Sequence, residues 1–116
     1  MDTLLVLTNL PDEASAERLA GVLVEQRLAA CITIFPGVRS VYRWQGVIER
    51  AGEVPLLIKT AADRFDALCT AIRAHHPYEL PEIVAVDIAT GLPEYLAWVH
   101  AETRPAGEQA DLLVQP

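Results

Sequence analysis

Apolar residues recur along the chain at two spacings, and these spacings predict its strands and helices. Short, nearly continuous aliphatic runs occupy residues 3–8, 54–60 and 83–88, and such runs are typical of buried strands. Apolar residues three and four positions apart predict one helix from Asp12 to near Arg27 and a second from Asp63 to His75. Each helix opens on an aspartate, which we expect to cap the free amide groups of its first turn.

A long hairpin is predicted between these helices. Residues 29–44 form a β-rich segment that Pro36 and Gly37 interrupt, and a proline inside a strand implies an edge, a bulge or a bend. We therefore expect this strand to kink at Pro36. Gln45-Gly46 then makes a tight connection into the next strand, and the hairpin is longer than the helices of a small domain can cover. Because an exposed apolar ribbon is a template for strand pairing, we expect its tip to bind another copy of the chain.

The order of the predicted elements is strand, helix, strand, strand, helix, strand, and an additional helix starts at Gly91-Leu92-Pro93. Two split βαβ halves in this order form an α+β, ferredoxin-like βαββαβ sandwich, with helices on one face of an antiparallel sheet. We expect one such domain over residues 1–103 and a flexible or docked tail over residues 104–116. The apolar run at residues 83–88 indicates a central strand covered on both faces. The uncovered sheet face favours association of several chains.

The composition indicates a folded, acidic protein. Of the residues, 52% are apolar and 22% are charged, which is far from the composition of disordered chains. Nine basic and sixteen acidic residues give a net charge of -7, which disfavours nucleic acids and anionic membranes and makes cations the more natural small partners. The N-terminus lacks a basic region, and no segment approaches the roughly 20 apolar residues that span a bilayer, so we expect a soluble, cytoplasmic protein.

The stretch from His75 to Ile83 is the part of the chain richest in potential chemistry, with imidazoles, carboxylates and a phenol between prolines. The prolines should end the preceding helix and keep this connector extended. Two interpretations of His76 stay open. Its imidazole binds a metal ion with Glu79 or Glu82, as suits Cu(II), Zn(II) or Ni(II), or it satisfies the last carbonyl groups of the preceding helix.

Two cysteines and a lysine are the remaining candidates. Cys31 lies mid-strand between apolar neighbours, where a thiol usually behaves as a small hydrophobe, and it is a further candidate metal ligand. Cys69 falls on the inner face of a predicted helix, and without a C-x-x-C pairing we expect both thiols to be reduced. Lys59 ends an aliphatic strand, where it either reaches a ligand cleft between subunits or is a solvated charge.

Several multi-residue motifs follow one another between residues 27 and 98. They are Arg27-Leu-Ala-Ala-Cys31, Pro36-Gly37-Val38, Ser40-Val-Tyr42-Arg-Trp44, Gly46, Leu56-Leu57-Ile58-Lys59-Thr60, His76-Pro-Tyr78-Glu79, Pro81-Glu82-Ile83 and Tyr95-Leu96-Ala97-Trp98. In this order they closely resemble the CutA family, the divalent-cation tolerance proteins. The resemblance implies a ferredoxin-like fold, a tight homotrimer whose hairpins pair with neighbouring subunits, and a cytoplasmic role linked to Cu(2+) and other heavy metals. Members elsewhere carry extra cysteines implicated in copper binding, which this chain lacks.

Two other functional classes compete with metal binding. Gln45-Gly46-Val47 with Arg50 resembles the acylphosphatase motif, but that loop leads into a helix whose N-terminus binds the anion, whereas this one joins two strands. No nucleophile with an adjacent base stands out either, so we expect no enzyme. The remaining alternative is a trimeric small-molecule-binding signalling module, with ligand sites near Lys59 in the clefts between subunits.

Overall fold

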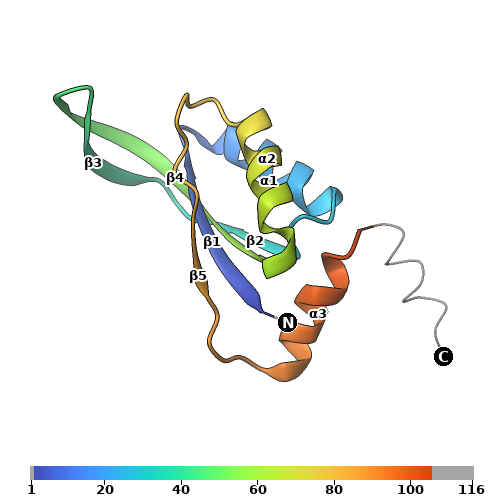
Figure 1. The fold of residues 1–116 in the computed structure, drawn as a ribbon. Helices are drawn as coiled ribbons and strands as arrows, with labels where there is room; N and C mark the ends of the chain where they lie inside the picture. The colour runs from blue at the N-terminus through green and yellow to red at the C-terminus, as the bar shows by residue number, and fades with distance from the viewer. Residues whose placement is uncertain (1, 106–116) are drawn as a thin grey trace, which may run out of the picture.

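The computed structural model describes residues 2–105, in which an antiparallel sheet carries two helices on one face and a third helix at its end (Figure 1). The elements are β1 (Thr3–Leu10), α1 (Glu13–Glu25), β2 (Cys31–Ile34), β3 (Val38–Trp44), β4 (Val47–Ala61), a short 3-10 turn (Ala62–Arg64), α2 (Phe65–His75), β5 (Val84–Asp87) and α3 (Pro93–Glu102). The strand order is β2-β4-β1-β5, with β3 paired to β4. The predicted ferredoxin-like fold is confirmed. Residues 106–116 of the predicted tail lie outside the described residues.

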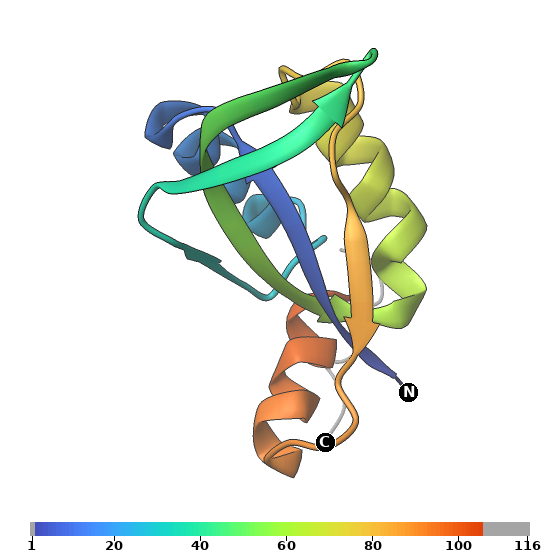
Figure 2. The same ribbon diagram turned by 90° about the vertical axis from the view of Figure 1, so that its left-hand side faces the viewer.

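The core lies between the sheet and the helices α1 and α2, because alternate residues of β1 and β4 point to that side. Val6 of β1 pairs with Ile58 of β4, and both are fully buried. The helices contribute aliphatic residues at helical spacing, namely Ala16, Leu19, Leu23, Leu68 and Ile72. Figure 2 shows α1 and α2 behind the sheet, with the other sheet face open toward the viewer.

The two aspartates predicted to cap helices behave differently. Asp12 caps α1, since its carboxylate accepts a hydrogen bond of 2.8 Å from the Ser15 amide, and this bond lowers its pKa. The prediction for Asp63 is wrong. That residue lies in the 3-10 turn before α2, and its two carboxylate oxygens each accept a bond of 2.7 Å from Arg104. A charged partner from the far end of the chain thus replaces the local amide groups.

The predicted kink at Pro36 is confirmed and takes the form of a one-residue bulge. Ile34 pairs with Leu56 and Val38 pairs with Glu53, so the three residues 35–37 lie opposite only two residues of β4. Side chains alternate between the faces of a strand, so one extra residue exchanges the faces for everything beyond it.

The alternation of side chains along β3 and β4 gives the hairpin two different faces. Tyr42 and Trp44 pair with odd-numbered residues of β4 and lie on the side that continues the open sheet face. Arg39 and Arg43 pair with even-numbered residues and lie on the side that continues the helix-covered face, as does Arg50. One face of the hairpin is therefore aromatic and the other is basic.

The hairpin projects from the body of the molecule (Figure 1), whose extents are 58 × 27 × 23 Å. Its two-residue turn has positive φ at both Gln45 (50°) and Gly46 (82°), which is the type I′ geometry that matches the twist of the strands. Val41 and Ile48 are 58% and 59% exposed. The predicted ribbon of uncovered apolar residues is thus present.

The strand at residues 83–88 was predicted to be central, and this is wrong for the single chain. β5 is the last strand of the sheet and pairs with β1, and no other described strand lies beyond it. Val84 and Val86 are 51% and 60% exposed on the open sheet face. A continuous apolar run is typical of a strand whose two faces are both covered. Within residues 2–105, no element covers the open face of β5 at Val84 and Val86. None of the helices in this range is long and apolar enough to cross a membrane.

Candidate functional site

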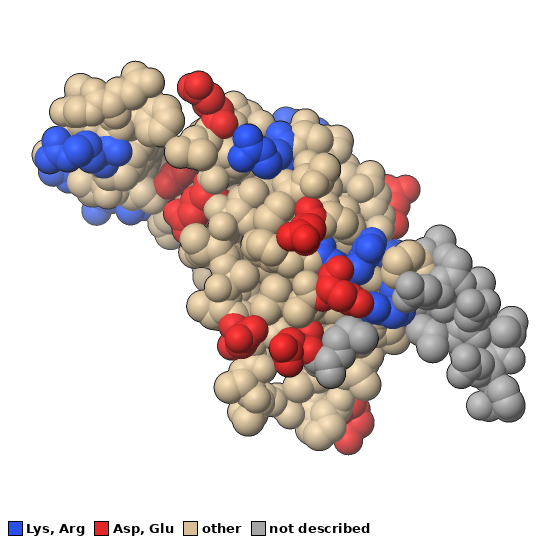
Figure 3. Space-filling view, viewed as in Figure 1, with Lys and Arg blue, Asp and Glu red and all other residues tan. Residues whose placement is uncertain are grey.

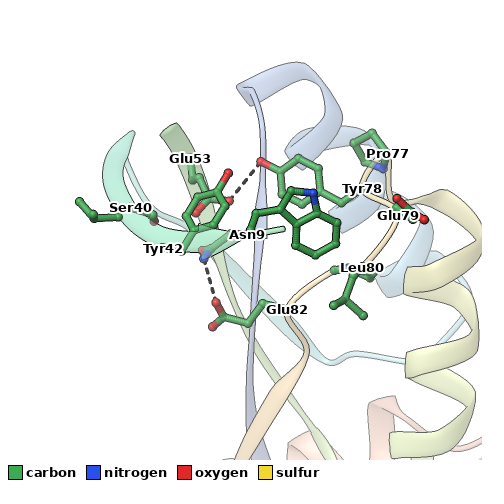
Figure 4. A pocket seen from close by; sticks show the side chains of 12 residues that line it. Asn9, Ser40, Tyr42, Glu53, Pro77, Tyr78, Glu79, Leu80 and Glu82 are labelled. Atoms are coloured by element: carbon green, nitrogen blue, oxygen red, sulfur yellow. Dashed lines mark hydrogen bonds between the residues drawn. The ribbon is translucent and has the colours of Figure 1, made fainter. Parts of the chain in front are cut away.

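The predicted connector forms one wall of a cavity, and the hairpin forms the other (Figure 4). The cavity has a volume of about 920 Å³. Its lining joins aromatic rings to carboxylates and includes no lysine, arginine or histidine; the residues that give it this character are Tyr42, Trp44, Tyr78, Glu53, Glu79 and Glu82. Such a lining is suited to a cation, since both carboxylates and ring faces attract positive charge.

His76 is not among the residues that line the cavity, and two backbone groups hold its side chain. The Asn9 carbonyl oxygen is 2.7 Å from Nε2, and the Tyr78 amide donates to Nδ1 over 3.1 Å. A carbonyl can only accept and an amide can only donate, so the neutral ring with its proton on Nε2 fits both bonds. Residue His76 is 8% exposed, and burial lowers its pKa.

These bonds correct one interpretation of His76. His76 occupies the C-cap position of α2, but its ring binds a carbonyl group of β1 and not the last carbonyl groups of that helix. A metal-ligating histidine typically donates its other ring N–H to a carbonyl or carboxylate, and Nε2 makes a bond of this kind to Asn9. A metal ion would bind Nδ1 only after the Tyr78 amide released it.

Glu53 and Tyr78 connect the base of the hairpin to the connector. The Tyr78 hydroxyl donates a hydrogen bond of 3.1 Å to Glu53 Oε2, and Glu53 is 8% exposed. Burial, followed by this bond to the carboxylate, raises the pKa of Tyr78 to about 12. Glu53 was not among the predicted site residues. The one signal in the sequence is a carboxylate directly before the buried run from Val54.

The predicted ligands Glu79 and Glu82 both line the cavity and are exposed. Asn9 donates a hydrogen bond of 3.4 Å from its side-chain amide to Glu82 Oε1, as Figure 4 shows. Within residues 2–105, no three His, Cys, Asp or Glu side chains are grouped closely enough to hold one metal ion. The donors that the cavity offers a divalent cation are therefore separate carboxylates, and the His76 ring is bonded instead to Asn9 and to the Tyr78 amide.

Cys31 and Lys59 lie in another part of the sheet. They are directly paired across β2 and β4, and Lys59 pairs in turn with Leu5 of β1. His76 binds Asn9, four residues further along β1, which corresponds to about 13 Å at the rise of a strand. The structure therefore does not bring Cys31 to His76 within one chain. The Lys59 ammonium instead lies 5.5 Å from the centre of the Tyr95 ring of α3.

The charges of the molecule are separated in the same region. Figure 3 shows basic side chains on the projecting hairpin and acidic side chains where the hairpin meets the body. The ion pairs within residues 2–105 are Arg27 with Glu102 and Arg104 with Asp63, and both lie outside the cavity. Within the described residues, neither the cavity carboxylates nor the hairpin arginines form an ion pair.

Comparison with known proteins identifies the family. The family model described as CutA1 divalent ion tolerance protein matches residues 4–102. The divalent-cation tolerance protein CutA of Pectobacterium atrosepticum is 43% identical over 103 residues, which cover 89% of this chain and 94% of that protein.

Solved structures agree in fold. The crystal structure of CutA from Xylella fastidiosa has a TM-score of 0.87 at 50% identity, and the match covers 90% of this chain and all (100%) of that one. The CutA of Archaeoglobus fulgidus, described as a periplasmic divalent cation tolerance protein, has a TM-score of 0.85 at 34% identity, with 88% and 99% covered. The resemblance found in the sequence is thus confirmed, and the chain belongs to the CutA1 family of divalent-ion tolerance proteins.

Proposed function

We propose that the protein is a cytoplasmic homotrimer that binds divalent cations, Cu²⁺ among them, and thereby contributes to metal tolerance. One observation carries the binding step: the cavity between hairpin and connector is lined by three carboxylates and by no basic side chain. The net charge of -7 adds a field that favours cations. The tolerance role follows from the family to which the chain belongs.

The proposed first ligands are Glu79 and Glu82, because both carboxylates are exposed and line the cavity. His76 is the proposed nitrogen ligand. Its Nε2–H bond to Asn9 orients the ring, and its Nδ1 lone pair becomes available when the Tyr78 amide gives way. Imidazole favours Cu²⁺ and Zn²⁺ over the hard cations that carboxylates alone would prefer. Cys31 lies too far along the sheet to join these ligands from the same chain, so it belongs to this site only through a neighbouring copy.

The proposed trimer is supported by the two free edges of the sheet. The outer edge of β3 and the outer edge of β5 have no partner strand among the described residues, and they are different surfaces. A contact between two different surfaces is head-to-tail, and it closes into a ring when the rotation allows. The exposed Val84 and Val86 on the open sheet face would be covered in such a ring.

Calorimetric titration with Cu²⁺ and Zn²⁺ tests the metal site. We expect the double variant Glu79→Gln/Glu82→Gln to bind Cu²⁺ at least about tenfold more weakly, since it keeps the side-chain size and removes both charges. We expect His76→Ala to lose Cu²⁺ affinity as well, whereas Glu94→Gln on α3 should bind like the original chain. Equal affinities in all four proteins would show that these residues do not bind the metal.

Light scattering tests the assembly separately. We expect three times the mass of one chain at micromolar concentration, and a monomer there would remove the homotrimer from the proposal. The metal titration remains interpretable in either case, because its ligands come from one chain.

A second candidate function rests on Lys59. Its ammonium group lies over the Tyr95 ring on the open sheet face, beside Cys31, where an anionic small molecule would find a positive charge and an aromatic surface. This candidate corresponds to the trimeric small-molecule-binding signalling module, the alternative that the sequence leaves open. Native mass spectrometry of the purified protein should reveal a bound organic molecule that Lys59→Ala loses. Identical spectra for the two proteins would leave metal binding as the function.

A further inference from the structure

A second, smaller cleft lies where the end of α1 meets α3. Its volume is about 380 Å³, and it shares no lining residue with the cavity between hairpin and connector. Small-molecule sites typically have volumes of about 300–1,000 Å³, so this cleft suits a ligand smaller than a nucleotide. Its lining brings together one guanidinium group, two carboxylates and an indole ring, from Arg27, Glu25, Glu102 and Trp98.

Arg27 has a backbone conformation that an arginine rarely adopts. The Leu28 amide donates a hydrogen bond of 2.9 Å to the Leu23 carbonyl oxygen at the end of α1. The Arg27 amide donates one of 3.1 Å to the Val24 carbonyl oxygen, and the two bonds together form a Schellman motif. This motif holds Arg27 at a φ of 59°, in the left-handed region that glycine adopts without a steric penalty. An arginine at a position that favours glycine indicates a role for its side chain.

The Arg27 side chain is only partly engaged within the described chain. Its Nη1 lies 3.4 Å from Glu102 Oε2, and the two side chains are 36% and 42% exposed. Strong charge-assisted contacts are about 2.7–2.9 Å long, so this ion pair is a weak one. Within residues 2–105, the remaining N–H groups of the guanidinium and the Glu25 carboxylate make no hydrogen bond. The cleft therefore offers groups of both charges to a ligand.

This mixture of charges selects the class of ligand. A phosphate or a dicarboxylate would face the two glutamates as well as the one guanidinium group, and a simple cation would face Arg27. A zwitterion meets an opposite charge on each side. In an α-amino acid the two charged groups are bonded to one carbon, and Arg27 and Glu102 are close enough to each other to reach both.

We propose that this cleft binds a free α-amino acid with an apolar side chain. Arg27 binds its carboxylate in a bidentate manner, and Glu102 and Glu25 accept hydrogen bonds from its ammonium group. The side chain of the ligand lies against Trp98 and Val24, which line the cleft and are 42% and 43% exposed. The site goes beyond the proposed metal function and shares none of its ligands.

Titration of the full chain with L-leucine and L-phenylalanine, in the absence of metal ions, tests this site. The tryptophan fluorescence should change on binding, and Trp98→Phe should abolish the change, because Trp44 lies outside the cleft. Two analogues separate the charges of the probe, since N-acetyl-L-leucine lacks the ammonium group and L-leucinamide lacks the carboxylate. We expect calorimetry to show that each analogue binds at least about tenfold more weakly than L-leucine.

Arg27→Gly separates binding from stability. Glycine relieves the left-handed strain, so we expect the midpoint of urea unfolding not to fall, whereas the L-leucine affinity should drop at least about tenfold. Arg27→Lys keeps the charge but loses the planar fork, and it should bind L-leucine more weakly than the original chain. Arg18→Gln, on an exposed residue of the same helix, is the matched control and should bind L-leucine like the original chain.

The carboxylates should decide the recognition of the ammonium group. We expect Glu25→Gln/Glu102→Gln to bind L-leucine at least about tenfold more weakly and to discriminate little between L-leucine and N-acetyl-L-leucine. Its Cu²⁺ affinity should be unchanged, so the amino-acid site and the proposed metal site are tested separately. Equal affinities for L-leucine and its two analogues, or no binding of L-leucine and L-phenylalanine at millimolar concentration, would overturn the proposal.

Discussion

The Tyr78 hydroxyl donates a hydrogen bond of 3.1 Å to Glu53 Oε2, and this bond ties the connector to the base of the projecting hairpin. Glu53 also lines the cavity between them. The same carboxylate therefore holds the two walls together and contributes to the charge of the space they enclose. A change at either residue should alter both the stability of the chain and the properties of the cavity.

Removing the hydroxyl group tests this link. We expect Tyr78→Phe to lower the free energy of unfolding by about 1–3 kcal/mol, because a buried carboxylate then loses its donor. Urea unfolding followed by circular dichroism measures the change. Tyr95→Phe is the matched control, since the Tyr95 hydroxyl makes no hydrogen bond within residues 2–105 and should cost little. Equal losses in the two variants would mean that the bond to Glu53 contributes nothing.

The pH dependence of stability should report on His76. Burial lowers its pKa from the ordinary value of 6.5, so the folded state holds the neutral ring and the unfolded state binds a proton more readily. The contribution of the neutral ring is complete above pH 6.5 and is lost as the pH falls through the lowered folded pKa. We expect the free energy of unfolding to decrease as the pH falls from about 6.5 toward 5.

The variant His76→Gln isolates this contribution. It has no titrating ring, so its stability should change less with pH over the same interval, although its absolute stability is lower. Urea unfolding at a series of pH values measures both slopes. Asp12 and Asp63 have lowered pKa values and titrate below 3.8, so their contributions stay constant in this interval. If the free energy of unfolding changed equally with pH in the two proteins, the pH dependence would come from groups other than His76.

The turn at the tip of the hairpin should tolerate substitution poorly for a backbone reason. Gly46 has a φ of 82°, although a Cβ added there would meet no atom within 4 Å. We expect Gly46→Ala to destabilise the hairpin by about 1–2 kcal/mol through left-handed strain alone. Hydrogen exchange of the β3 and β4 amides should speed up in this variant. Gly52→Ala, where the φ is ordinary and space is open, is the control and should leave exchange at the tip unchanged.

The local patterns of the sequence predict most of the fold. Apolar spacing locates α1, α2 and the strands of the core, and Pro36 marks the bulge, because each depends on residues close in the chain. The prediction that Asp63 caps a helix is wrong because its carboxylate binds Arg104, which lies 41 residues away. The prediction that the strand at residues 83–88 is central is wrong for a related reason, since a run of apolar residues does not say what covers it.

The candidate site is predictable only in part. The connector concentrates carboxylates, and the structure places Glu79 and Glu82 at the cavity. The contribution of Glu53 depends on its distance in space from Tyr78, which no local pattern encodes. The bonds of His76 to Asn9 and to the Tyr78 amide likewise require the register of β1 against the connector. Long-range contacts therefore decide which of the predicted residues act together.

The extra residue in segment 35–37 lies where the hairpin leaves the body of the molecule. Removing one of these three residues would eliminate the bulge, while the two-residue turn at Gln45-Gly46 would keep the pairing of β3 with β4. The hairpin would then keep both of its faces but lose the bend and the added twist at its base. The length of a three-residue segment thus sets the direction in which the hairpin leaves the sheet.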